Sequence, residues 1–172
     1  MRTDPIKAAV FDFGQTIMRE ETCNDPYLRN CPIDLMPGVR EALEAIPLPK
    51  GIWANTRRAM PRDVRDWLIR AELDRHISFI ATSFEIGYRK PHLEFFERAL
   101  ALCGLAAADV VFVGNQLNTD IAGANGAGIR SVYLAGSSYR SVDDDPCCEA
   151  KPTFSIESLF DLPALIAKVT VR

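Results

Sequence analysis

The chain has 172 residues, of which 48% are hydrophobic and 25% are charged, with a formal net charge of -3. This length and apolar content predict one compact domain over residues 1–172 and exclude a chain that is disordered throughout. The charge gives no basic field, so nucleic acid is not indicated as a partner, and the lack of a long apolar run or a signal-peptide core predicts a cytoplasmic protein with no membrane partner.

Short apolar runs bounded by turn residues alternate with helical patterns along the chain. The runs that predict strands are Ile6–Phe11, Gly51–Ala54, Ile77–Ala81, Asp109–Val113, Arg130–Leu134 and Thr153–Phe154. The patterns that predict helices are Gly38–Ile46, Pro61–Ala71, Pro91–Cys103, Thr119–Ala127 and Ile156–Lys168. Repeated strand-helix units predict a doubly wound α/β fold, in which a mostly parallel sheet lies between two helical layers.

Single residues support these boundaries. Pro61 and Pro91 suit the first position of a helix, Thr119 suits a helix cap, and Gly128 suits a left-handed residue after a helix. Residues 18–36 and 136–151 are rich in turn-forming residues and predict two irregular segments.

The five cysteines are odd in number and form no CxxC pair, which favours reduced thiols over a disulfide framework. A zinc site built from Cys23, Cys31, Cys147 and Cys148 is a weak alternative, since their spacing is not typical of zinc ligands.

Asp12 directly follows the first predicted strand and precedes a turn at residues 14–16. Open α/β sheets bind ligands beyond the carboxyl ends of their strands, so Asp12 is a candidate nucleophile, and the alternative is a carboxylate that caps its own turn. Lys90 precedes the predicted helix at Pro91, where a cation opposes the helix dipole. An anion held between this ammonium and the helix start would explain that placement, although a solvated lysine is the alternative.

Polar residues also follow two other predicted strands. Asn115 and Asp120 lie in the loop after the strand Asp109–Val113, where Asp120 either caps the next helix or orients Lys90 or a metal. Asn55 and Thr56 follow the strand Gly51–Ala54, where they are candidates for binding phosphate oxygens or form an ordinary turn.

Four ordered segments resemble the motifs of the haloacid dehalogenase (HAD) superfamily, whose members are mostly magnesium-dependent phosphatases. These are FDFGQTI at 11–17, WANT at 53–56, YRKP at 88–91 and VGNQLNTDIAGA at 113–124. The resemblance covers nearly the whole chain and implies a Rossmann-like core of the HAD type.

The resemblance implies a role for each matching residue. Asp12 corresponds to the nucleophile that forms an aspartyl-phosphate, and Lys90 to the residue that neutralises the phosphoryl group. Asp12, the backbone carbonyl of Gly14 and Asn115 correspond to the magnesium ligands. Asp120 corresponds to an acidic residue that supports the metal site.

Three positions depart from the pattern of the phosphatases: Gly14 replaces an aspartate that acts as general acid and base, Ala54 replaces a Ser or Thr, and Asn115 replaces a ligand aspartate. A phosphatase of low activity is the leading hypothesis. A degenerate member that binds a phosphorylated ligand or a protein partner without turnover is the second, and metal-independent dehalogenation ranks last.

The segments between the motifs are too short for the helical cap that many relatives insert, so the chain resembles the capless branch. Capless relatives tend to act on large substrates or to cover the site by forming oligomers, so the resemblance also suggests a homo-oligomer. Arg57, Arg58, Arg62 and Arg89 are candidates for a basic rim around a phosphorylated substrate, with a solvated helix face as the alternative.

Overall fold

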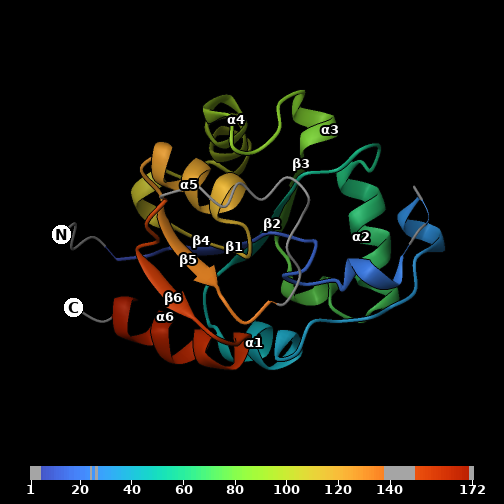
Figure 1. Cartoon of the computed structure of the whole chain (residues 1–172), viewed down its shortest axis with the longest axis horizontal. Helices are drawn as coiled ribbons and strands as arrows, with labels where there is room; N and C mark the ends of the chain where they lie inside the picture. Colours follow the sequence, from blue (N-terminus) through green and yellow to red (C-terminus); the bar gives the residue numbers. More distant parts are fainter. Residues whose placement is uncertain (1–4, 24, 26, 138–149, 171–172) are drawn as a thin grey trace.

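The computed structural model describes residues 5–23, 25, 27–137 and 150–170. In these residues one sheet of six parallel strands has the order β3-β2-β1-β4-β5-β6 (Figure 1). The strands are β1 (Ala8–Phe11), β2 (Lys50–Ala54), β3 (Phe79–Thr82), β4 (Val110–Gly114), β5 (Arg130–Leu134) and β6 (Phe154–Ile156). The predicted doubly wound, parallel α/β architecture is confirmed.

The two central strands, β1 and β4, are buried along their whole length. Parallel strands covered on both faces have continuous apolar sequences, which is why Ala8–Phe11 and Val110–Gly114 lack polar side chains. Phe11 is in register with Ile52 of β2 and with Val113 of β4, so β1 lies between these two strands. The strand order reverses between β1 and β4, and ligands of such sheets bind at the carboxyl ends of the strands at this point.

Helices cover both faces of the sheet and complete the three layers (Figure 1). The larger apolar cluster lies under α1 (Val39–Ala45), α2 (Pro61–Arg70) and α6 (Leu162–Thr170). The other lies under α4 (Leu93–Cys103) and α5 (Ala122–Gly126), next to the short helix α3 (Ser83–Ile86).

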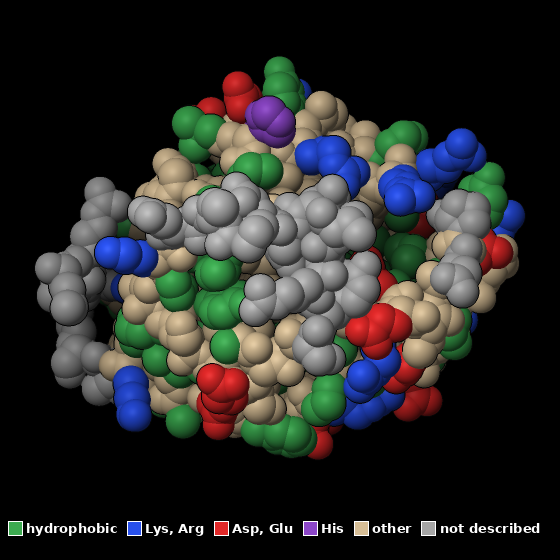
Figure 2. Space-filling view, in the orientation of Figure 1, with side chains coloured by type: hydrophobic (Ala, Val, Ile, Leu, Met, Phe, Trp, Pro, Cys, Tyr) green, Lys and Arg blue, Asp and Glu red, His purple; other side chains and the backbone are tan. Residues whose placement is uncertain are grey.

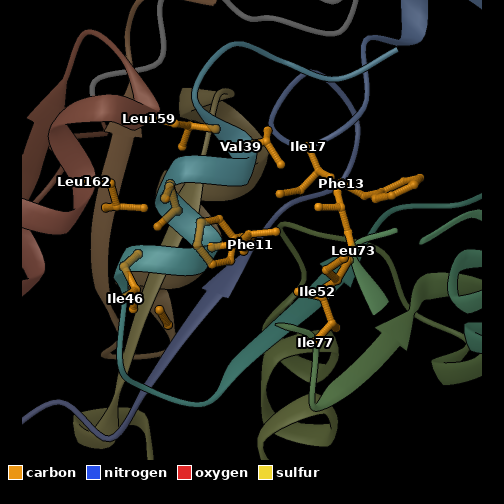
Figure 3. Close-up of a cluster of buried hydrophobic side chains, with 14 of the residues drawn as sticks. Phe11, Phe13, Ile17, Val39, Ile46, Ile52, Leu73, Ile77, Leu159 and Leu162 are labelled. Atoms are coloured by element: carbon orange, nitrogen blue, oxygen red, sulfur yellow. The ribbon is translucent and has the colours of Figure 1, made fainter. Parts of the chain in front are cut away.

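Alternate residues of the strands divide between these two clusters. In β1, Phe11 belongs to the larger cluster and Val10 to the other. Figure 3 shows Phe11 against α1, with Leu159 and Leu162 on the same side of the sheet. The sheet therefore holds its central strands between two packed cores, and only the loops at the strand ends are left to build a site.

Several predicted boundaries are wrong. Helix α4 begins at Leu93 after the N-cap His92, so Pro91 is not its first residue and Lys90 lies two positions before the cap. Ile156 belongs to β6, and α3 had not been predicted. Thr119 does not cap a helix, because it lies inside a π-helical turn, Leu117–Ile121, which precedes α5.

Other predicted turn features are confirmed. Gly128 has a φ of 72° and takes the left-handed conformation after α5. Pro61 is the first residue of α2.

Cys23 and Cys31 form a disulfide, with their α-carbons 5.1 Å apart. The expectation of reduced thiols is wrong for this pair, because the loop through two short 3-10 helices, Glu20–Thr22 and Leu28–Asn30, brings the two cysteines together. This also excludes the pair as free thiolate ligands of zinc. Cys147 and Cys148 lie outside the described residues, and within them Cys103 is the only free cysteine.

No helix among the described residues is long and apolar enough to cross a membrane.

Helix α5 approaches the start of α4 so closely that only glycine fits at residue 123. A Cβ on Gly123 would lie 2.7 Å from Cζ of Phe96 and 3.0 Å from the α-carbon of Pro91. We expect Gly123→Ala to lower the free energy of unfolding by about 1–3 kcal/mol, because this contact joins two backbones and a buried ring. Gly126→Ala in the same helix is the control, since a Cβ there meets no atom within 4 Å. Urea denaturation of both variants measures the difference, and equal stabilities would contradict this close packing.

Candidate active site

Three side chains from separate loops meet at the carboxyl ends of β1 and β4. The Nζ atom of Lys90 lies 2.6 Å from Oδ1 of Asp12 and 2.7 Å from Oδ1 of Asp120. All three residues are buried, and their exposed fractions are 3%, 9% and 1% for Lys90, Asp12 and Asp120. The structure thus brings together the three residues that the sequence singled out as catalytic candidates.

The side chain of Asn55 positions Lys90 by binding its backbone on both sides. Asn55 Nδ2 donates to the carbonyl oxygen of Lys90 at 3.0 Å, and the backbone N–H of Lys90 donates to Asn55 Oδ1 at 2.8 Å. The ammonium also lies 5.1 Å from the centre of the Phe112 ring, which is an attractive cation-π arrangement. Lys90 is therefore held by its backbone, an aromatic face and two carboxylates, and it is not the solvated lysine of the alternative prediction.

Asp120 is held by the π-helical turn that follows β4. Its Oδ2 accepts the backbone N–H of Gln116 at 3.1 Å, while Oδ1 accepts the ammonium. A Cβ on Gly114 would lie 2.5 Å from the Asp120 side chain, so the absence of a side chain at residue 114 makes room for this carboxylate. The second of the two readings from sequence, in which Asp120 orients Lys90, is the one that the geometry supports.

Two buried amide groups beside Asp12 lack partners among the residues that the structure describes. Asn115 accepts the hydroxyl of Thr16 at Oδ1, at 3.4 Å, but its Nδ2 forms no hydrogen bond there. Gln15 Nε2 is buried and unpaired in the same way. Because an unpaired buried donor is costly, both amide groups are candidates for contacts with a ligand or water.

The proposed phosphate-binding residues differ in what their side chains can do. Asn55 uses both ends of its amide on the backbone of Lys90, so its demonstrated contacts are those of a positioning residue, and phosphate binding by Asn55 stays a prediction. The hydroxyl of Thr56 donates its only proton to the carbonyl oxygen of Ala59 at 2.8 Å. In this arrangement that hydroxyl cannot donate to a phosphate oxygen and does not replace the hydroxyl missing at Ala54.

The buried charges shift one another's pKa values. Burial, and next the negative charge of Asp120, raise the pKa of Asp12 from 3.8 to about 7 against the opposing effect of Lys90. Burial alone would lower the pKa of Lys90, but the two carboxylates outweigh it and keep that pKa above its ordinary value. Lys90 therefore stays charged at neutral pH, whereas the ionisation of Asp12 is finely balanced.

The donors near Asp12 fit a hard divalent cation. The Asp12 carboxylate, the Gly14 carbonyl and the Asn115 amide offer oxygen atoms, which are the ligands that Mg²⁺ takes. Oδ1 of Asn115 already accepts the Thr16 hydroxyl, and an amide oxygen has a second lone pair that is left for a cation. Only one of these three donors carries a charge, so the set favours weak binding.

Glu20 is a residue of this site that the sequence pattern did not indicate. A Cβ placed on Gly14 would overlap Oε1 and Cδ of Glu20 and lie 2.8 Å from Oε2, so the Glu20 carboxylate fills the space beside Gly14. Burial raises the pKa of Glu20, while Lys90 and Arg57 act to lower it. An irregular loop has no periodicity to reveal such a contact, and the only signal was an acidic pair at residues 20–21 soon after the first motif.

Arginines lie on the surface next to these loops. Arg57, Arg58, Arg62 and Arg89 are exposed, and Nη1 of Arg89 donates to the carbonyl oxygen of Thr56 at 3.2 Å. Figure 2 shows Lys and Arg side chains gathered on the side of the molecule where α2 and α3 lie. Arg89 is thereby fixed beside the loop after β2.

Comparisons with known proteins agree with this geometry. The profile of a family described as HAD-hydrolase-like matches residues 87–162. A glyceraldehyde 3-phosphate phosphatase of Methanocaldococcus jannaschii is 32% identical over 105 residues, which are 60% of this chain and 44% of that protein. The chain thus spans less than half the length of this curated relative.

Solved structures show the same fold. An uncharacterized protein of Listeria monocytogenes serotype 4b gives a TM-score of 0.80 at 24% identity, covering 95% of this chain and 98% of that chain. A HAD phosphatase of Thermococcus onnurineus gives 0.70 at 16% identity, covering 96% of this chain and 100% of that chain. At less than 25% identity these two likenesses show the fold alone, which agrees with the predicted Rossmann-like core. The family profile agrees with the predicted resemblance over residues 87–162, which include the third and fourth motifs.

The raised pKa of Asp12 predicts how the stability of the metal-free protein depends on pH. Between pH 3.8 and about 7 the folded protein keeps a proton on Asp12 that the unfolded chain has lost. The free energy of unfolding therefore falls as the pH rises through this range. We expect the wild type, in the presence of a chelator, to lose on the order of a few kcal/mol relative to Asp12→Asn between about pH 5 and about pH 8.

Denaturant titrations at a series of pH values measure this difference. Asp66→Asn removes an exposed carboxylate of α2, outside the buried cluster, and is the matched control. If Asp12→Asn and Asp66→Asn show the same pH dependence, Asp12 does not carry the raised pKa.

Proposed function

We propose that this chain, which is a haloacid dehalogenase-like protein by fold and by the order of its motifs, hydrolyses phosphomonoesters through an aspartyl-phosphate on Asp12. The observation that carries the proposal is the buried contact of Lys90 with both Asp12 and Asp120 at the carboxyl ends of β1 and β4. A nucleophile, a fixed cation and unpaired amide donors at one such point suit the transfer of a phosphoryl group.

Asp12 is arranged so that one of its oxygens remains available. Lys90 binds Oδ1, whereas Oδ2 forms no hydrogen bond with the residues that the structure describes. In the proposed reaction Oδ2 attacks the phosphorus atom, the ester oxygen leaves, and water then hydrolyses the acyl phosphate and restores the carboxylate. The phosphoryl group passes through Asp12, so this residue is indispensable.

Lys90 stabilises the charge of the transferring group. An ammonium has three N–H donors, and two of them bind Asp12 and Asp120, which leaves one for a phosphoryl oxygen. Asp120 holds the ammonium in place while Asp12 reacts, because the backbone N–H of Gln116 fixes its second oxygen. We assign Asp120 a positioning role on these contacts.

Magnesium is the cofactor that we propose, held by Asp12, the Gly14 carbonyl and Asn115. When bound, it supplies positive charge to the oxygens of the phosphoryl group. The weak charge of this donor set leads us to expect a modest affinity.

For the substrate we propose only the phosphomonoester group and not the molecule that carries it. The relative from Methanocaldococcus jannaschii is named for glyceraldehyde 3-phosphate, and we extend only the reaction class to this chain. The exposed arginines near residues 57 and 89 support a substrate with further negative charge. A cytoplasmic location and a homo-oligomer remain predictions from sequence.

A second candidate function is binding of a phosphorylated ligand without turnover. It is favoured by the absence of a carboxylate at Gly14 and Asn115 and of a hydroxyl at Ala54, and by the Thr56 hydroxyl, which donates to Ala59. The two functions use the same residues and differ in whether a phosphate becomes attached to Asp12.

Asp12→Asn tests the proposed function. We expect magnesium-dependent hydrolysis of 4-nitrophenyl phosphate by the wild type and a loss of roughly a thousandfold or more in the variant, because an amide oxygen is a poor nucleophile. Release of inorganic phosphate measures the rate, and Asp66→Asn serves as the control. Equal rates for the wild type and Asp12→Asn would exclude catalysis by Asp12, and binding of inorganic phosphate by an inactive wild type would favour the second function.

Asn115→Asp tests the metal ligands. The variant keeps the oxygen that accepts the Thr16 hydroxyl and loses only an unpaired amide, so it adds a negative charge without breaking a hydrogen bond among the described residues. We expect magnesium to bind roughly tenfold more tightly or better, measured by isothermal titration calorimetry. Ser78→Asp adds the same charge just before β3, at the opposite ends of the strands, and should leave the affinity unchanged. Equal affinities for the two variants would place the metal away from Asn115.

A further inference from the structure

The carboxylate of Glu20 lies beside Gly14, two residues after Asp12. The overlap with a Cβ built on Gly14 shows that this carboxylate occupies the space a side chain on residue 14 would take. Any other residue at position 14 would have to displace it. Gly14 and Glu20 therefore form a complementary pair, in which the first lacks a side chain and the second fills the gap.

The loop that carries Glu20 is fixed by backbone hydrogen bonds. The backbone N–H of Gln15 donates to the carbonyl oxygen of Met18 at 2.7 Å, and the backbone N–H of Arg19 donates to the carbonyl oxygen of Asp34 at 2.9 Å. The 3-10 helix Glu20–Thr22 begins directly after these bonds. These bonds thus hold the backbone just before Glu20, whose side chain lies beside Gly14.

Glu20 differs from the other two acids near Lys90 in its contacts. Asp12 and Asp120 each give an oxygen to the ammonium, whereas the Glu20 carboxylate forms no hydrogen bond or ion pair within the part of the chain that the structure describes. Glu20 as a whole residue is exposed to solvent, unlike the two buried aspartates, while its carboxyl group lies in the space beside Gly14. It is therefore an unpaired carboxyl group beside the turn that follows Asp12, on a residue with access to water.

We propose that Glu20 is the catalytic residue that transfers protons in this site, protonating the departing ester oxygen and then deprotonating the attacking water. The proposal rests on the proposed function, since it needs Asp12 as the nucleophile. It adds a role for a residue outside the four motifs. Gln15, the nearest polar alternative in the same turn, has an amide side chain that cannot supply a proton as an acid.

The proposed reaction has two steps, in which Glu20 first gives up a proton and then regains it. In the first, a bond forms between Oδ2 of Asp12 and phosphorus, the bond from phosphorus to the ester oxygen breaks, and that oxygen takes the proton of the Glu20 carboxyl group to leave as an alcohol. In the second, Glu20 takes a proton from water while the water oxygen attacks phosphorus, and the bond to Asp12 breaks. The products are the alcohol and inorganic phosphate, and Glu20 has its proton again.

Glu20→Gln tests the role, with Glu21→Gln as a matched control in the same 3-10 helix. Two substrates are compared: 4-nitrophenyl phosphate, whose leaving group needs little protonation, and an alkyl phosphate such as glycerol 2-phosphate, whose alkoxide needs a proton. We expect Glu20→Gln to lower alkyl phosphate hydrolysis by roughly a hundredfold or more. With 4-nitrophenyl phosphate we expect a burst of nitrophenolate followed by slow turnover, and mass spectrometry should find phosphate on the peptide that contains Asp12.

A second experiment moves the carboxylate from residue 20 to residue 14 and asks whether activity returns. Glu20→Ala should show the same loss on the alkyl phosphate, and adding Gly14→Asp to it should recover at least roughly tenfold, since the acid now grows from the backbone into the vacated space. Both variants can be checked for folding by circular dichroism. Should Glu20→Gln fold poorly, the comparison of Glu20→Ala with and without Gly14→Asp decides the question.

The outcomes separate the two proposals. If Glu20→Gln behaves like Glu21→Gln on both substrates while Asp12→Asn is inactive, the role of Glu20 is overturned and the proposed function stands. A failure of Gly14→Asp to improve on Glu20→Ala also overturns it. An inactive wild type with no phosphate on Asp12 overturns the proposed function, and the role of Glu20 falls with it.

Discussion

The site depends on a single buried cation shared by two carboxylates. Taking Lys90, Asp12 and Asp120 out of water costs several kcal/mol for each ion before their mutual attraction is counted. Such a cluster forms only where the scaffold fixes all three groups at short range, and here the ammonium lies 2.6 Å and 2.7 Å from the two oxygens. Burial, and next the negative charge of Asp120, outweigh the ammonium of Lys90, so the pKa of Asp12 rises to about 7. The same arrangement keeps a nucleophile near the balance between its two protonation states.

The scaffold achieves this precision through close backbone approaches and an aromatic support. Gly114 leaves room for the Asp120 side chain, and Gly123 lets α5 approach the backbone of Pro91, directly after Lys90. Beneath the ammonium, the ring of Phe112 stacks on Trp53 with centroids 5.9 Å apart. Residues of the sheet and of the helical layer that packs on it therefore together fix the position of Lys90.

Much of this could be predicted from sequence, because the strands and motifs can be recognised in their order along the chain. Buried strands have continuous apolar runs, so Asp12 and Asn115 could be placed at strand ends, and the parallel sheet followed from the alternation of elements. The predicted start of α4 was wrong. Pro91 suggests a first helical turn, but His92 is the N-cap and the helix begins at Leu93. The contacts between Asn55 and Lys90 and between Glu20 and Gly14 had no sequence signal, because they arise where irregular loops fold back on one another.

Each polar group of the site then has a separate task that its contacts already define. Lys90 has one donor left after binding two carboxylates, and Asp120 is tied to the backbone of Gln116, so the ammonium keeps its place when Asp12 turns to a phosphorus atom. The oxygen that attacks and the group that moves protons must be different carboxyls, because a carboxylate that becomes an acyl phosphate cannot also protonate the departing oxygen. Asp120 is excluded from the second task by its two hydrogen bonds. Of the three acids near Lys90, Glu20 alone combines an unbound carboxyl group with access to water.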